Sequence, residues 1–296
     1  MSHAAAARVP PDWPHRAHSL TVRVGTLDWH LQRAGCGPTL LLLHGTGASA
    51  HSWAGLLPAL AEVATVVAPD LPGHGWTLGA GPADLSLPRI ATALDALLGV
   101  LDVAPPAMAV GHSAGAALAL RWALGRRGAD APRALLGFNP SLVAPPALYT
   151  QWLAPLLNPV ATSAPVAALL AAVSARAGLV DALLASTGST LPPAQRALYT
   201  RLFGRGEHVR GSMGFMAAAD LPALLQDVRD LRTPTTFVLG RADRWVPTAP
   251  LERVIAAALP EAKLLHWPGG HLLHEVEPDR AAALVRAQLR SDTAGP

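Results

Sequence analysis

Val110-Gly111-His112-Ser113-Ala114-Gly115 is the stretch of sequence that decides the fold. An apolar run at 107–110 predicts a short buried strand before the turn, and helical spacing of apolar residues at 114–127 predicts a helix after it. The glycines on either side of Ser113 permit a sharp turn that bulkier residues would obstruct. Such a turn raises the serine above the edge of the sheet and points the first amides of the helix at the atom that it attacks. The stretch therefore predicts a nucleophilic serine; an idle serine in a glycine-rich turn is the alternative.

Strand-like apolar runs alternate with helical patterns on both sides of this turn. The predicted strands cover residues 19–24, 27–32, 39–43, 65–68, 107–110, 134–138, 235–239 and 262–266. The predicted helices lie at about 51–62, 87–101, 114–127, 221–228, 250–259 and 278–289. This alternation predicts an α/β fold with one mostly parallel sheet, helices on both of its faces, and the first two strands as a hairpin at its edge.

The alternation stops after the strand at 134–138, and residues 140–215 have the pattern of helices interrupted by prolines. We therefore predict an N-terminal extension at 1–18, a core domain of 19–139 and 216–296, and a helical cap at 140–215 inserted into that core. Residues 134–175 contain no charged side chain and no histidine, but their prolines leave no stretch of about 20 apolar residues intact. This segment is not predicted to span a membrane.

A nucleophilic serine needs a general base, and two predicted loops supply candidates for the base and its partner. Asp243 follows the strand at 235–239, and His271 follows the strand at 262–266. Because parallel strands end at the same edge of a sheet, we expect both side chains to lie near Ser113. Asp227, Asp230 and His274 are weaker candidates, and an ion pair with Arg241 or Arg244 is the alternative role for Asp243.

The charge that develops on an attacked carbonyl oxygen needs hydrogen-bond donors. One predicted donor is the amide of Ala114, directly after the nucleophile, and the other is the amide of Thr46, in the loop after the strand at 39–43. His44 is predicted to brace that loop. The charge-free cap sequence predicts a mainly apolar pocket for a bulky hydrophobic substrate. The predicted substrate contacts are Gly45, His112, Trp152, Tyr199 and Phe215.

Composition narrows the class of protein. Hydrophobic residues make up 51% of the chain and charged residues 15%, which permits a large core. Lys263 is the only lysine and the arginines are scattered, so no nucleic-acid binding is expected. Cys36 is the only cysteine and the N-terminus lacks a signal-peptide pattern, which favours a cytoplasmic location. The sequence shows no zinc-like ligand spacing and no phosphate-binding loop, so we expect no metal and no cofactor.

The chain resembles the α/β-hydrolase superfamily over nearly its whole length. The resemblance rests on His44-Gly45-Thr46-Gly47, Gly111-His112-Ser113-Ala114-Gly115, Asp243 and His271. Dehalogenases and epoxide hydrolases of this superfamily use an aspartate as nucleophile, whereas this chain has a serine. The resemblance therefore implies cleavage of an ester or related acyl bond through a Ser-His-Asp triad.

A narrower resemblance is to the BchO-type magnesium-chelatase accessory hydrolases. It rests on residues 12–14, 40–53, 66–75 and 110–123. In the predicted cap it rests on 186–189, on 197–199 with 202–203, and on 208–209 with 211. It implies a role in bacteriochlorophyll synthesis and association with magnesium chelatase, but no established substrate. Together with the apolar cap, this setting predicts a hydrophobic, tetrapyrrole-related substrate; peripheral membrane contact stays open. Two alternatives are a non-catalytic tetrapyrrole-binding helper of the chelatase and a general carboxylesterase unrelated to pigment synthesis.

Overall fold

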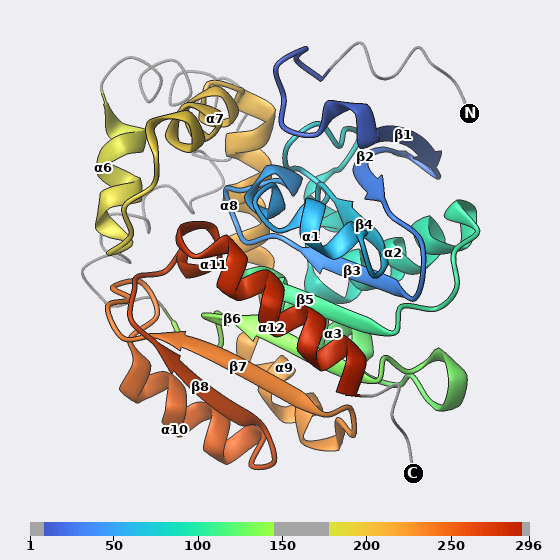
Figure 1. Cartoon of the computed structure of the whole chain (residues 1–296), viewed down its shortest axis with the longest axis vertical. Coiled ribbons are helices and arrows are strands. Elements are labelled where there is room, and N and C mark those ends of the chain that lie inside the picture. The colour runs from blue at the N-terminus through green and yellow to red at the C-terminus, as the bar shows by residue number, and fades with distance from the viewer. Residues whose placement is uncertain (1–8, 145–177, 292–296) are drawn as a thin grey trace.

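Aliphatic runs form the centre of the sheet, because a strand that is covered on both faces needs apolar side chains in both directions. The computed structural model describes residues 9–144 and 178–291. Within these residues, eight strands form one sheet in the order β1-β2-β4-β3-β5-β6-β7-β8 (Figure 1). The strands are β1 (Ser19–Val24), β2 (Leu27–Ala34), β3 (Thr39–Leu43), β4 (Thr65–Pro69), β5 (Met108–His112), β6 (Ala134–Phe138), β7 (Thr235–Gly240) and β8 (Lys263–Trp267).

The sheet is parallel except at one edge. Strands β1 and β2 form an antiparallel hairpin, and β2 pairs antiparallel with β4. All other neighbouring pairs, from β4 through β3 to β8, are parallel. The predicted α/β fold with a mostly parallel sheet and an edge hairpin is therefore confirmed. The loops after β3, β5, β6, β7 and β8 leave the sheet at the same edge, which brings distant parts of the sequence together.

Helices cover both faces of the sheet. Leu40 and Leu42 of β3 belong to a hydrophobic cluster that also contains side chains of α1, α11 and α12, while Leu41 and Leu43 belong to the cluster on the other face, with side chains of α2, α3 and α10. Figure 1 shows α12 and α1 in front of the sheet. The helices are α1 (Leu57–Ala61), α2 (Leu87–Leu101), α3 (Ala114–Ala123), α6 (Leu179–Ser186), α7 (Pro193–Phe203), α8 (Gly206–Ala218), α9 (Leu221–Asp227), α10 (Thr248–Ala258), α11 (Leu273–Val276) and α12 (Pro278–Ser291).

Two predicted helices are shorter in the structure. The helix expected at 51–62 is divided into a 3₁₀ turn at Ala50–Trp53 and the short α1, because Pro58 stands in the first turn of α1 and cannot donate to a preceding helical turn. The helix expected at 114–127 ends at Ala123. Leu124 is extended, and Gly125 has φ of +80°, a conformation that ends a helix.

The described residues between β6 and β7 contain helices α6 to α9, and no strand occurs among them. Figure 1 places α6, α7 and α8 together beyond one end of the sheet. The part of the predicted cap at 145–177 lies outside the described residues, and so does the predicted substrate contact Trp152. In the part of the chain that the structure describes, no helix is both long enough and apolar enough to cross a membrane.

The described part of the predicted N-terminal extension packs onto α7 and the core. Trp13 is 2% exposed, and its ring meets that of Trp76 edge to face with centroids 5.5 Å apart. Both guanidinium amines of Arg201 in α7 donate to the carboxylate of Asp12, at 2.7 and 2.9 Å. Residues 9–18 therefore join α7 to the core.

Candidate active site

Ser113 occupies a strained turn between β5 and α3. Its φ of +52° and ψ of −118° lie outside the regions that side-chain-bearing residues prefer. A Cβ on Gly111 would lie 2.4 Å from Cα of Ala116, and a Cβ on Gly115 would lie 2.1 Å from the carbonyl oxygen of Leu43. Both glycines are therefore required by close backbone approach, and α3 packs directly against the end of β3.

The three residues predicted to react together lie in one chain of hydrogen bonds. Nδ1 of His271 is 2.8 Å from Oδ2 of Asp243, and Nε2 of His271 is 3.0 Å from Oγ of Ser113. Because a carboxylate only accepts, Nδ1 carries the proton, which leaves Nε2 of the neutral ring to accept from the serine hydroxyl. This arrangement can remove a proton from Ser113 and return it.

The loop after β7 holds Asp243 in place. Its Oδ1 accepts from the backbone amides of Trp245 and Val246, at 2.8 and 2.9 Å, while Oδ2 faces His271. Both carboxylate oxygens therefore have partners, although the side chain is buried. The structure shows no ion pair of Asp243 with Arg241 or Arg244 among the described residues.

Two side chains with roles that the sequence did not predict fix the backbone of His271. Nε2 of His112 donates to the carbonyl oxygen of His271 at 2.9 Å. Nδ2 of Asn139, which follows β6, donates to the same oxygen at 2.9 Å and to that of Gly270 at 3.0 Å, and its Oδ1 accepts from the amide of Gly240 at 2.6 Å. The only sequence signal for Asn139 was its place at a strand end, where site residues gather.

The loop after β3 lies directly against Ser113. A Cβ on Gly45 would lie 2.8 Å from Nδ1 of His112 and 3.1 Å from Cβ of Ser113, so only glycine fits there. Among the described residues, the amides of Thr46 and Ala114 have no hydrogen-bond acceptor. These two amides are the predicted oxyanion donors.

Two buried histidines brace this loop. Nδ1 of His44 donates to the carbonyl oxygen of Gly45 at 2.8 Å, and its Nε2 accepts from the amide of Leu71 at 2.9 Å. His208 of α8 donates through Nε2 to the carbonyl oxygen of Gly47 at 3.1 Å and accepts from Gly75. Burial lowers the pKa of His44 and lowers that of His208 to about 3. Both rings are therefore neutral at physiological pH, as these hydrogen bonds require.

The remaining predicted substrate contacts lie in differing surroundings. Gly45 and His112 adjoin Ser113 as described above. Phe215 is fully buried in the main core, with its ring edge to face with that of His74. Tyr199 is buried, and its hydroxyl donates to Oε1 of Glu275 at 2.6 Å. The substrate contacts stay predictions.

Glu275 in α11 carries a buried carboxyl group. Burial raises its pKa to about 8, and the hydrogen bond from Tyr199 only partly opposes this effect. The folded protein therefore keeps this proton over a pH range in which the unfolded chain releases it. The stability that depends on the proton falls as pH rises from about 4.5, the ordinary value, to about 8, and levels off above that.

Replacing Glu275 with glutamine is expected to remove this pH dependence. Glutamine can accept from Tyr199 but has no carboxyl group to ionise, so its stability relative to wild type should rise between about pH 5 and about pH 8. Urea unfolding at both pH values measures the effect, with the exposed Glu261→Gln as control. An equal stability difference at both pH values would contradict the buried, neutral carboxyl group.

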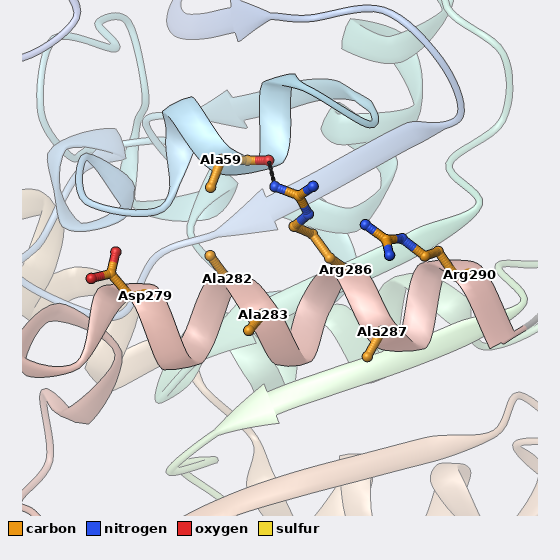
Figure 2. A pocket seen from close by; sticks show the side chains of 7 residues that line it. All are labelled: Ala59, Asp279, Ala282, Ala283, Arg286, Ala287 and Arg290. Carbon is orange, nitrogen blue, oxygen red and sulfur yellow. Dashed lines mark hydrogen bonds between the residues drawn. The ribbon is translucent and has the colours of Figure 1, made fainter.

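A surface groove between α1 and α12 contains none of these residues (Figure 2). Nη1 of Arg286 donates across it to the carbonyl oxygen of Ala59 at 3.1 Å and to Oε2 of Glu62 at 2.7 Å. The lining offers no serine, cysteine or histidine, so this groove is not the candidate active site. It is lined by Ala59, Asp279, Ala282, Ala283, Arg286, Ala287 and Arg290.

Comparison with known proteins shows the family of the chain. Residues 40–287 match the model of the alpha/beta hydrolase family. The chain belongs to this family. It is 36% identical over 284 residues to the magnesium-chelatase 30 kDa subunit of Rhodobacter capsulatus, covering 94% of this chain and 96% of the relative. The predicted resemblance to the BchO-type hydrolases is therefore confirmed.

Solved structures of this α/β-hydrolase family share the fold. An alpha/beta hydrolase fold protein from Burkholderia ambifaria superposes with a TM-score of 0.71 at 24% identity, covering 90% of this chain and 99% of that one. A variant of the epoxide hydrolase from Solanum tuberosum has a TM-score of 0.72 at 21% identity, covering 92% and 99%. At these identities the likeness shows the fold alone.

Proposed function

We propose that this α/β-hydrolase cleaves an ester or related acyl bond through Ser113, His271 and Asp243. The observation that carries the proposal is the continuous hydrogen-bond chain, with His271 at 2.8 Å from Asp243 and 3.0 Å from Ser113. If the serine were idle, a buried carboxylate and an imidazole would have no reason to align on its hydroxyl group.

In the proposed reaction, Oγ of Ser113 attacks the acyl carbon while its proton passes to Nε2 of His271. The tetrahedral intermediate collapses, and the leaving alcohol takes that proton from His271 as the carbon–oxygen bond breaks. A water molecule then attacks the acyl-serine, giving one proton to His271. The ester bond to Ser113 breaks, the proton returns to Oγ, and the carboxylic acid leaves. Asp243 holds the imidazole in the required tautomer and stabilises its cationic form.

The amides of Thr46 and Ala114 are proposed to bind the oxyanion of both tetrahedral intermediates. The loop that holds Thr46 touches Ser113 at Gly45, and Ala114 begins α3, whose N-terminus favours negative charge. The braces from His44 and His208 hold this loop in place before substrate arrives. Such preorganised donors stabilise charge that develops only during the reaction.

We propose that residues 140–215 form a cap over the core of 19–139 and 216–296, and that the substrate pocket between them is mainly apolar. Two described aromatic side chains support this. A Cβ on Gly47 would lie 3.0 Å from the ring of Phe203, and the ring centroid of Trp245 is 5.6 Å from that of His271. Aromatic rings next to both the oxyanion loop and the base suit a bulky hydrophobic acyl group better than a charged one. Trp152, Tyr199 and Phe215 are proposed as further contacts.

The biological setting is inferred from the relative that is named as a magnesium-chelatase subunit. We infer that this chain acts in the cytoplasm beside magnesium chelatase during bacteriochlorophyll synthesis, on a tetrapyrrole-related substrate. The competing functions are a non-catalytic tetrapyrrole-binding helper and a general carboxylesterase.

Complementation of a strain that lacks this chain separates the three functions. The wild-type chain is expected to restore the bacteriochlorophyll content, and Ser113→Ala, expressed at the same level, is expected to fail. Full restoration by Ser113→Ala would favour the non-catalytic helper. Normal pigment content in the strain without the chain would favour the general carboxylesterase.

A further inference from the structure

Residues 186–189, which we call the clamp segment, run from the last residue of α6 into the connection to α7 and lie between the two loops that hold Asp243 and His271. Gly188 has φ of +77°, and a Cβ on it would lie 2.3 Å from the carbonyl oxygen of Ala242. On the other side, a Cβ on Gly270 would lie 2.3 Å from the carbonyl carbon of Gly188. The backbone at Gly188 is therefore confined between the residue before Asp243 and the residue before His271.

Hydrogen bonds attach the clamp segment to the backbone of the base. The amide of His271 donates to the carbonyl oxygen of Thr187 at 3.0 Å, and the amide of Leu272 donates to Oγ of Ser189 at 2.8 Å. The amide of Ser189 in turn donates to Oγ1 of Thr187 at 3.1 Å. Thr187 and Ser189 are buried, so water does not readily replace these partners.

The clamp segment also reaches the loop of the acid. Nε1 of Trp245 donates to Oγ of Ser186 at 3.0 Å, and the amide of Trp245 donates to Oδ1 of Asp243. One short segment from the helical insertion thus contacts the loops of both the base and the acid. These loops follow different strands and are also joined within the core, where the amide of Ala242 donates to the carbonyl oxygen of Gly269 at 2.8 Å; the clamp segment adds a second connection from outside the core.

We propose that the clamp segment is a positioning element that sets the place of His271 relative to Asp243 and Ser113. The carbonyl oxygen of His271 is held from one side by His112 and Asn139, and its amide is held from the other by Thr187. The peptide groups on both sides of the base are therefore fixed. This inference rests on the proposed function and adds to it a part of the helical insertion that acts through His271 without touching substrate.

The first test is Gly188→Ala, compared with Gly125→Ala. Gly125 has φ of +80°, almost equal to that of Gly188, but nothing lies within 4 Å of a Cβ placed on it. Both variants place a side chain at nearly the same positive φ, and only the Cβ of Gly188→Ala meets the loop that holds Asp243. We expect kcat on a p-nitrophenyl ester to fall ~100-fold in Gly188→Ala with little change in KM, and to stay near wild type in Gly125→Ala. Equal kcat values in the two variants would overturn the proposal.

The second test uses Ser189, whose replacement changes no backbone angle. Ser189→Ala removes the acceptor for Leu272 and is expected to lower kcat, and Ser189→Thr, which keeps a hydroxyl, is expected to recover it. If Ser189 only filled space, the larger threonine would not restore kcat. Wild-type kcat in Ser189→Ala would overturn the proposal even if Gly188→Ala failed to fold.

A spectroscopic signal separates this proposal from the proposed function. The proton that His271 shares with Asp243 should give a low-field proton NMR signal, identified by its loss in Asp243→Asn. We expect the signal to shift or broaden in Gly188→Ala and Ser189→Ala, whether or not wild type hydrolyses the ester. An unchanged signal in both variants refutes the clamp, whereas absence of Ser113-dependent hydrolysis in wild type refutes only the proposed function.

Discussion

Replacing Ser113 with alanine is expected to lower kcat for a p-nitrophenyl ester by ~10⁶-fold, the scale on which loss of a triad serine acts. Without Oγ no acyl-enzyme forms, and His271 has no hydroxyl to deprotonate. The residual rate should come from the oxyanion donors and substrate binding alone. Steady-state kinetics measure the effect, and circular dichroism checks the fold.

Ser86→Ala is a matched control for this change. Ser86 precedes α2, and its side chain makes no capping hydrogen bond, so its loss should leave kcat unchanged. If Ser113→Ala retained more than about a tenth of the wild-type kcat, measured on purified protein, Ser113 would not be the nucleophile.

Replacing Asp243 with asparagine is expected to lower kcat by ~10⁴-fold while the fold is kept. The amide has nearly the shape of the carboxylate, but it no longer favours the tautomer with the proton on Nδ1, and it cannot stabilise the cationic ring. The substitution changes the 2.8 Å contact between Oδ2 of Asp243 and Nδ1 of His271. The measurement is kcat on the same ester, with urea unfolding as a check of stability.

Asp227→Asn is the control for this second prediction. Its carboxylate pairs with Arg121 at 2.6 Å and is half-exposed, so its loss should be nearly neutral. Near wild-type turnover in Asp243→Asn, together with loss of turnover in Asp227→Asn or Asp230→Asn, would show that the acid is misassigned.

The sheet could be predicted closely because burial on both faces leaves a clear pattern. The strand Thr39–Leu43 and the helix Leu87–Leu101 have the predicted bounds, since continuous aliphatic residues and helical apolar spacing mark them without ambiguity. The placement of Ser113, Asp243 and His271 at one edge was predicted from their positions directly after strands of a mostly parallel sheet, together with the Ser, acid, His order that this fold uses. The four-residue helix α11 was missed because one turn is too short to show periodicity.

The supporting parts of the site could not be predicted, because they join residues far apart in the chain. Asn139 bonds to Gly270 across 131 positions, and His208 bonds to Gly75 across 133. Strand-end position suggests that such residues are near the site, but it does not say which atoms meet. Thr187 and Ser189 matched a family pattern in the predicted cap. Their hydrogen bonds to the loop of His271 could not be predicted from that pattern, because they form only when the chain folds.

The most direct test of the central claim is covalent labelling by an alkyl fluorophosphonate, followed by intact-mass measurement and peptide mapping. The proposed mechanism predicts one adduct in the wild-type protein, on the peptide that contains Ser113, and none in Ser113→Ala. It also predicts much slower labelling of Asp243→Asn, since His271 then activates the serine poorly. A wild-type protein that stays unmodified, or equal labelling of wild type and Ser113→Ala, would contradict nucleophilic catalysis by Ser113.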